Sequence, residues 1–239
     1  MKRTIAILAV LAFASVAVAQ SPIVSLDSYQ IKKTLQAEGY PLDLDTTFDT
    51  TPYSGNWNRG WEDLNSHIES AEFGLSSGLS LPSSPAWNQM SAVGFDSSSW
   101  DRYFYLNVEV EDGWQMELDG LIYGGLKASG TGPVAGKTTI IVDGGTEEDV
   151  RAYSITGSYA NYTDDLSSDD LVAYDTVEVR WYGKGASSHL GTHRVGDHYD
   201  NGNYTNLGIN GTVTQVPEPA TMALLGLGGV AALIRRRRA

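Results

Sequence analysis

The chain has 239 residues, with 29 acidic and 16 basic side chains and no cysteine. Between Gln20 and Pro219 it carries 10 basic against 29 acidic residues, a formal balance of −19. Nucleic-acid binding needs a basic surface, so this composition excludes nucleic acid as a partner. The absence of cysteine excludes disulfides, lipoprotein attachment, thiol catalysis and cysteine-ligated metals.

Residues 1–19 have the pattern of a secretory signal peptide. Two basic residues precede a mostly apolar stretch from Ile5 to Val18. Ala17 and Ala19 form a small-x-small cleavage motif directly before Gln20. We therefore expect the secretion machinery to export the chain and the mature protein to begin at Gln20, with an uncleaved N-terminal anchor as the alternative.

The first part of the exported region has the least regular pattern. Residues 28–39 predict a short helix that ends at Gly39, and residues 54–100 are rich in loop-forming residues. Exposed tryptophan faces stack on sugar rings, so the tryptophans suggest a polysaccharide platform, with core filling as the alternative. The candidates are Trp57, Trp61, Trp87 and Trp114.

Alternation of apolar and polar residues is clearest further along the chain. Tyr103–Val110 places Phe, Leu, Val and Val on one face, and Thr176–Tyr182 places Val, Val and Trp on one face. Each pattern predicts a half-buried strand. Further strands are predicted over residues 118–123, 138–142, 150–156 and 212–214.

Glycine-rich turns separate the predicted strands. They lie at Asp112–Gly113, Gly124–Gly125, Gly130–Gly136, Asp143–Gly145, Asn201–Gly202 and Asn210–Gly211. Short strands joined by such turns predict an all-β fold, an antiparallel β-sandwich. Because no linker divides the region, we expect one domain over residues 20–216.

Three histidines form the one group that suggests a metal site. On a helix, His189 and His193 would share a face, with His198 nearby in sequence. The glycines around them disfavour a helix, so a solvated loop is the favoured interpretation and no metal site is assigned.

The acidic stretches at residues 43–49, 147–149 and 164–170 leave two interpretations open, a solvated surface or a structural Ca²⁺ on one loop. No nucleophile elbow, phosphate loop or His-Glu-x-x-His motif is present, so we expect no enzyme activity and assign no catalytic residue. A glycoside hydrolase is the enzymatic alternative, because its carboxylate pair is defined by distance in space.

The C-terminal residues 217–239 consist of three successive parts. Pro217, Glu218 and Pro219 come first, an apolar run from Ala220 to Ile234 follows, and a basic cluster comes last. The cluster is Arg235, Arg236, Arg237 and Arg238. A 15-residue helix spans about 22 Å, less than the roughly 30 Å hydrocarbon core, so we expect a short transmembrane helix with a temporary membrane stage. The arginines act as a stop signal on the cytoplasmic side.

These three parts resemble the PEP-CTERM sorting signal of Gram-negative bacteria. The resemblance implies that the proline and glutamate residues 217–219 are recognised by exosortase, a membrane protease. It also implies export across the inner membrane and delivery to the cell surface or an exopolysaccharide-containing matrix.

The region from about Trp100 to Val213 also resembles ectodomains common among PEP-CTERM proteins. The shared motifs are Tyr103-Phe104-Tyr105, Gly113-Trp114, Ser129–Pro133, Arg180–Ser188 and Leu207–Gly211. This resemblance implies a jelly-roll-like sandwich of the kind seen in carbohydrate-binding modules, but it supplies no binding residues. The function indicated is a non-enzymatic surface or matrix protein. The alternative is a carbohydrate-binding module that interacts with exopolysaccharide.

Overall fold

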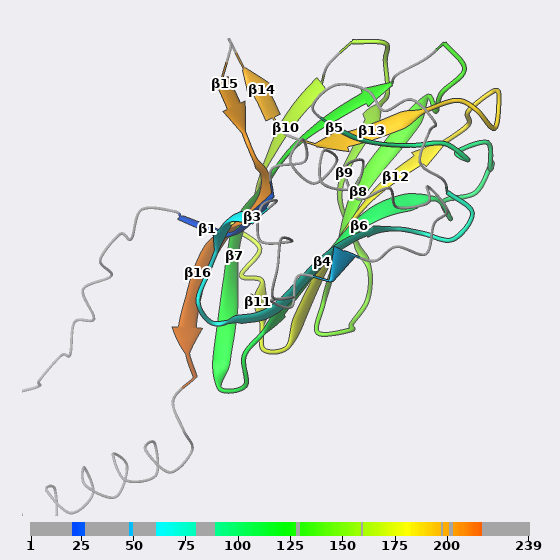
Figure 1. Cartoon of the computed structure of the whole chain (residues 1–239). Coiled ribbons are helices and arrows are strands. Elements are labelled where there is room, and N and C mark those ends of the chain that lie inside the picture. The colour runs from blue at the N-terminus through cyan, green and yellow to red at the C-terminus, as the bar shows by residue number, and fades with distance from the viewer. Residues whose placement is uncertain are drawn as a thin grey trace, which may run out of the picture.

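A computed structural model of the protein describes residues 21–26, 48–49, 61–79, 89–127, 130–158, 160–196, 198–200 and 203–216. Within these ranges the regular structure consists of sixteen strands, in two large antiparallel sheets and one small hairpin. The two large sheets lie as facing layers (Figure 1). The predicted all-β sandwich is therefore confirmed.

The first sheet has eight strands. They are β1 (Ser21–Leu26), β3 (Trp61–Leu64), β5 (Gln89–Ala92), β7 (Trp114–Lys127), β10 (Ala160–Asp165), β11 (Val172–Ala173), β13 (His193–Gly196) and β16 (Leu207–Gln215). The order is β3-β1-β16-β7-β13-β5, and β10 and β11, which lie off this path, also pair with β7. The long β7 is therefore the strand around which this sheet is built.

The second sheet has six strands. In spatial order they are β2 (Phe48–Asp49), β4 (Ile68–Leu75), β6 (Tyr103–Val110), β12 (Thr176–Lys184), β8 (Ala135–Val142) and β9 (Glu148–Ser154). Strands β14 (His198–Asp200) and β15 (Asn203–Thr205) form the separate hairpin. They flank Asn201–Gly202, where the sequence predicts a tight turn.

The core lies between the inner faces of the two large sheets. In β6 and β12 buried and partly exposed residues alternate as predicted, so Leu106 and Val179 point inward. The fully buried ring of Trp181 contacts rings from both sheets, 6.3 Å from Phe73 and 5.8 Å from Tyr123 between centroids. Burial of these apolar side chains stabilises the cysteine-free fold.

Two predicted turns are wrong, because glycine serves a different purpose at each. Gly124–Gly125 lies within β7, where its backbone pairs with β10 and β13. Asn210–Gly211 lies within β16 at a register shift. A Cβ atom at Gly211 would approach the Glu117 carbonyl oxygen to 2.0 Å, so the glycine permits close backbone approach.

The predicted turn at Asp143–Gly145 is confirmed and has an additional function. Asp143 and Gly144 both have positive φ, at 49° and 64°, as a tight hairpin turn requires. The Asp143 carboxylate also accepts hydrogen bonds of 2.9 to 3.1 Å from three successive backbone N–H groups, those of residues 174–176. The turn after β8 therefore holds the segment that leads into β12.

The N-terminal part is more regular than its sequence indicates. Residues 54–100, expected to be rich in loops, contribute β3, β4 and β5 to the two sheets. The expectation that early strands complete the same sandwich is thus confirmed. The predicted helix at residues 28–39 lies outside the described residues.

Candidate functional site

Both predicted processing sites lie next to the ends of the sandwich. Strand β1 begins at Ser21, directly after the predicted signal-peptide cleavage site, and Ser21 pairs with Gly211 of β16. At the other end, the Val216 amide donates a 2.8 Å hydrogen bond to the Gly113 carbonyl. The triplet Pro217 to Pro219, which is predicted to be recognised by exosortase, follows directly in the sequence. Residues 1–19 and 217–239, including the predicted transmembrane helix, lie outside the described residues.

The outer face of the six-stranded sheet carries a group of aromatic side chains. Strand alternation turns Tyr103 and Tyr105 outward, because their neighbours in β6 point into the core. Tyr182 pairs with Tyr103, with ring centroids 4.8 Å apart, and Trp100 meets the Tyr182 ring edge-on at 6.2 Å. Trp100 is 38% exposed, whereas Tyr182 is buried beneath its neighbours. We call Trp100, Tyr103, Tyr105 and Tyr182 the aromatic face.

Basic side chains lie on the aromatic face. The Lys184 ammonium is 4.3 Å from the Trp100 ring centroid, and the Lys137 ammonium is 5.0 Å from that of Tyr182 and 5.8 Å from that of Trp100. The Arg180 guanidinium lies 4.7 Å from the Tyr103 ring centroid. Each distance is within the range of a cation–π interaction.

Glu147 connects the polar groups of this face. Its carboxylate accepts 2.7 Å hydrogen bonds from the hydroxyls of Tyr182 and Thr139 and a 3.0 Å bond from Arg180. Burial alone would raise the pKa of Glu147, but these hydrogen bonds and the charge of Arg180 lower it below its usual value. Glu147 is therefore ionised at neutral pH and holds these side chains in place.

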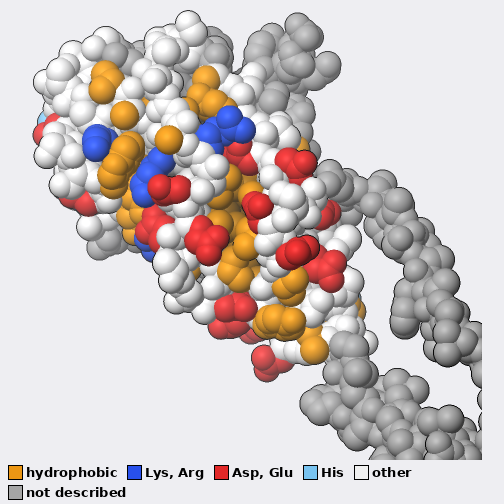
Figure 2. All heavy atoms as spheres, turned by 180° about the vertical axis from the view of Figure 1, so that it is seen from behind, with side chains coloured by type: hydrophobic (Ala, Val, Ile, Leu, Met, Phe, Trp, Pro, Cys, Tyr) orange, Lys and Arg blue, Asp and Glu red, His pale blue; other side chains and the backbone are white. Residues whose placement is uncertain are grey.

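The opposite end of the same face is acidic. Glu72, Glu109 and Glu178 lie on β4, β6 and β12, away from Lys184. The Glu72 carboxylate accepts a 2.7 Å hydrogen bond from Tyr105. Figure 2, seen from behind, shows Lys and Arg beside hydrophobic side chains in the upper half and a predominance of acidic side chains below. Charge is thus unevenly distributed over the face that Figure 2 shows.

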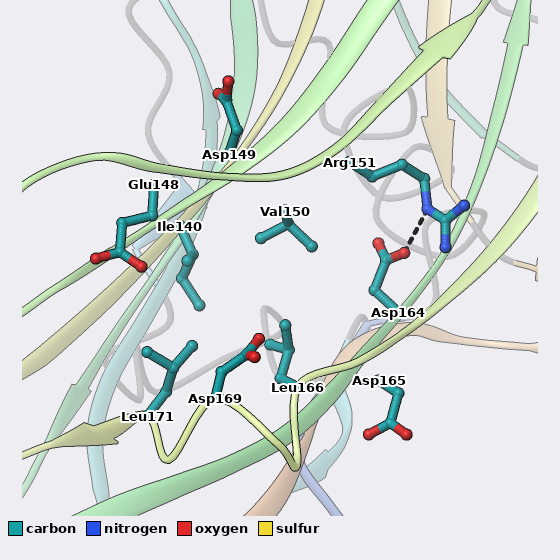
Figure 3. A pocket seen from close by; sticks show the side chains of 10 residues that line it. All are labelled: Ile140, Glu148, Asp149, Val150, Arg151, Asp164, Asp165, Leu166, Asp169 and Leu171. Atoms are coloured by element: carbon teal, nitrogen blue, oxygen red, sulfur yellow. Dashed lines mark hydrogen bonds and ion pairs between the residues drawn. The ribbon is translucent and has the colours of Figure 1, made fainter.

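A pocket of about 200 Å³ opens between β9 and β10, at one side of the sandwich. Its apolar lining is Ile140, Val150, Leu166 and Leu171. In Figure 3, Asp149 and Asp165 point away from Val150 at the centre, whereas Asp169 points toward it. Because these carboxylates do not converge, the pocket does not resemble a calcium site.

A buried polar network links the two sheets beside this pocket. Asp164, which is 5% exposed, accepts hydrogen bonds from Tyr123 (2.8 Å) and from the Arg151 guanidinium. The Thr138 hydroxyl in turn donates to the Tyr123 oxygen at 2.8 Å. Burial raises the pKa of Tyr123, which keeps its hydroxyl protonated as the donor. The network has a structural function, because it joins β8 and β9 to β7 and β10.

The histidines that suggested a metal site are separated by the fold. His189 lies in an exposed loop, with Nδ1 3.4 Å from an oxygen of Asp96. His193 is fully buried in β13, its ring packed on Phe95 and Phe104, so a solvated loop is wrong for this residue. Within the described ranges, no three His, Cys, Asp or Glu side chains are arranged to hold a metal ion.

Trp114 is the one tryptophan of the predicted polysaccharide platform whose side chain the structure describes. Trp114 stacks on the His67 ring at a centroid distance of 3.3 Å, so one of its faces is covered. Trp57, Trp87 and the side chain of Trp61 lie outside the described residues. Sequence reasoning missed the aromatic face, although the outward Tyr103 and Tyr105 of the alternating strand were a signal for it.

Comparison with known families identifies the tail. Residues 215–238 match the PEP-CTERM protein-sorting motif. The chain carries a PEP-CTERM sorting signal. This motif supports an exported protein that is sorted at the cell envelope, and the predicted resemblance of the tail to the PEP-CTERM signal is confirmed. No curated protein matches the sequence.

Solved structures similar to the chain include several family 29 carbohydrate-binding modules. A mutant of one, in complex with mannohexaose, has a TM-score of 0.41 and 11% identity and covers 81% of this chain and 93% of its own. Another, from Piromyces equi, has a TM-score of 0.35 and 11% identity and covers 64% and 85%. At these scores the similarity carries no argument about function.

Among the described residues, no helix is long and apolar enough to cross a membrane.

Proposed function

We propose that this PEP-CTERM protein is a non-enzymatic component of the cell surface or extracellular matrix of a Gram-negative bacterium. Its tail would be recognised and cleaved by an exosortase-like membrane protease. The observation that carries the proposal is the sorting motif at residues 215–238, which begins where β16 ends. A short helix over residues 220–234 would hold the precursor in the inner membrane until cleavage.

The chain crosses repeatedly between the two sheets, from β4 to β5, β6, β7 and β8. This topology supports the jelly-roll-like arrangement that we infer. A stable sandwich that ends immediately before the motif suits a domain released intact, since cleavage after the triplet would leave every described strand in the product.

The processing step can be tested in cells that contain or lack the exosortase-like enzyme. Mass spectrometry of the mature protein should find the chain without Arg235–Arg238 only where the enzyme is present. Replacing Pro217, Glu218 and Pro219 by alanine should retain the full-length chain in the membrane fraction. An intact arginine tail on all mature protein, in cells that have the enzyme, would contradict the proposal.

The aromatic face favours a second function, binding of a polysaccharide by the exported domain. Aromatic rings present apolar faces suited to sugar rings, and Trp100 keeps 38% of its surface exposed next to Tyr103 and Tyr105. Affinity electrophoresis of the mature protein in gels that contain a polysaccharide tests this function. Trp100→Ala should abolish retardation, whereas Tyr174→Ala, at a 59% exposed tyrosine in the turn before β12, should not.

A further inference from the structure

Two of the few basic residues of the exported region lie beside exposed Trp100. Between positions 20 and 219 the chain has 10 basic and 29 acidic residues. The ammonium groups of Lys137 and Lys184 nevertheless both lie at the Trp100 ring. We call Trp100, Lys137, Tyr182 and Lys184 the basic corner. Charges further apart than about 8 Å are largely screened at physiological salt, so a ligand here experiences these lysines more than the distant acidic groups.

The two lysines keep charge available for a ligand. Among the described residues, no carboxylate lies within ion-pair distance of Lys184. The Lys137 side chain, which is 19% exposed, is 2.9 Å from the Asp149 carboxylate, which is 73% exposed, so water screens this pair on one side only. Arg180 differs, because Glu147 and Glu178 both bind its guanidinium, at 3.0 and 2.5 Å. The positive charge of the face is therefore available mainly at Lys184, with a smaller contribution from Lys137.

The hydrogen-bonding groups at the corner determine what a ligand must supply. An ammonium group has three donors and no acceptor. The Glu147 carboxylate beside the corner already receives bonds from Thr139, Arg180 and Tyr182, and the Asp149 carboxylate accepts one from Lys137. The hydroxyl groups of a neutral sugar can accept hydrogen bonds from the lysines but supply no opposite charge. A ligand with negatively charged oxygen atoms fits the donors that are available.

We infer that the basic corner binds an acidic polysaccharide, with a uronate carboxylate between the lysines and a sugar ring on the exposed part of Trp100. This inference rests on the second function proposed above and specifies its ligand class. The acidic end of the face, with Glu72, Glu109 and Glu178, repels a negatively charged polymer and confines it to the corner. The footprint is therefore expected to be a few sugar residues long.

The test is affinity electrophoresis of the mature, processed protein, which measures its retardation by a polymer in the gel. The gels contain polygalacturonate, its methyl-esterified form or poly-glutamate, all with a chelator present. We expect retardation by polygalacturonate alone, and a weaker effect as the salt concentration rises. Lys184→Gln should weaken binding about tenfold, as expected for loss of about 1.4 kcal/mol. Gln115→Glu on β7 makes the same change in net charge in the other sheet and should leave binding unchanged.

Each other outcome has a definite meaning. Equal retardation by the methyl ester would overturn the inference of an acidic ligand but leave the proposed polysaccharide binding intact. No retardation by any of several acidic and neutral polysaccharides would overturn both the inference and the proposed polysaccharide binding. Binding of poly-glutamate as tight as that of polygalacturonate would show a general polyanion site and contradict the inference. Full binding by Lys184→Gln, with the folded-state circular dichroism spectrum retained, would remove the basic corner as the site.

Discussion

The polar network between the two sheets allows a direct test of the folding argument. In Asp164→Asn the side chain keeps its shape but loses its charge, and with it two charge-assisted hydrogen bonds, from Tyr123 and Arg151. The matched control is Asp149→Asn, which makes the same chemical change at a side chain that is 73% exposed and paired with Lys137. Only the buried substitution interrupts a link between the sheets.

The expected magnitudes follow from burial. Hydrogen bonds to charged groups contribute about 1.5 to 3 kcal/mol each. The Arg151 side chain is 40% exposed and can be rehydrated, so its share lies at the low end and the total is about 3 kcal/mol. For a domain of this size that corresponds to a fall in Tm of roughly 6 to 12 °C. Asp149→Asn should cost less than about 1 kcal/mol, because surface pairs contribute little.

Thermal and urea unfolding, followed by circular dichroism at neutral pH, measures both variants. Tyr123→Phe removes only the hydroxyl that lies between Thr138 and Asp164, and it should fall between the other two variants. If Asp164→Asn and Asp149→Asn unfold at the same temperature, the network does not hold the sheets together and this reasoning is refuted.

Three further predictions concern single residues. Glu147→Gln should destabilise the protein at pH 7, with the difference from the parent closing as pH falls below the usual pKa of a glutamate, about 4.3. Hydrogen bonds lower the pKa of Glu147 in the folded state, so the stability that these bonds contribute is lost when the Glu147 carboxylate is protonated. Urea unfolding as a function of pH measures this difference in stability. Asp143→Ala should cost about 1 to 2 kcal/mol for positive φ alone, with Asp143→Asn recovering most of it in the same assay. Gly211→Ala should lower Tm by several degrees because its Cβ would meet the Glu117 carbonyl, whereas Gly157→Ala, with open space around it, should be neutral.

Local patterns in the sequence predicted much of the sandwich correctly. Strands β6 and β12 were predictable because alternation along a strand depends only on which face is buried. The turn at Asp143–Gly145 was predictable because positive φ strongly favours these residue types. The same glycine rule was wrong at Gly124 and Gly211, because a glycine also serves close backbone approach within a sheet, and that depends on a distant strand.

The aromatic face could not be assembled from the sequence alone. Trp100, Lys137 and Tyr182 are far apart along the chain and meet only because β12 pairs with β6 on one side and β8 on the other. The histidines show the reverse case: His189 and His193 are close in sequence, but the fold exposes one and buries the other.

The sequence by itself determined that this protein carries a sorting signal and what type of fold it has. The sorting motif is a linear signal, and strand alternation and turn chemistry are local properties, so each can be recognised without coordinates. Only the tertiary structure decided where charge and aromatic surface coincide. Pairing of β12 with β6 and β8 gathers lysines around Trp100 on an otherwise acidic protein, and the register of distant strands sets that arrangement.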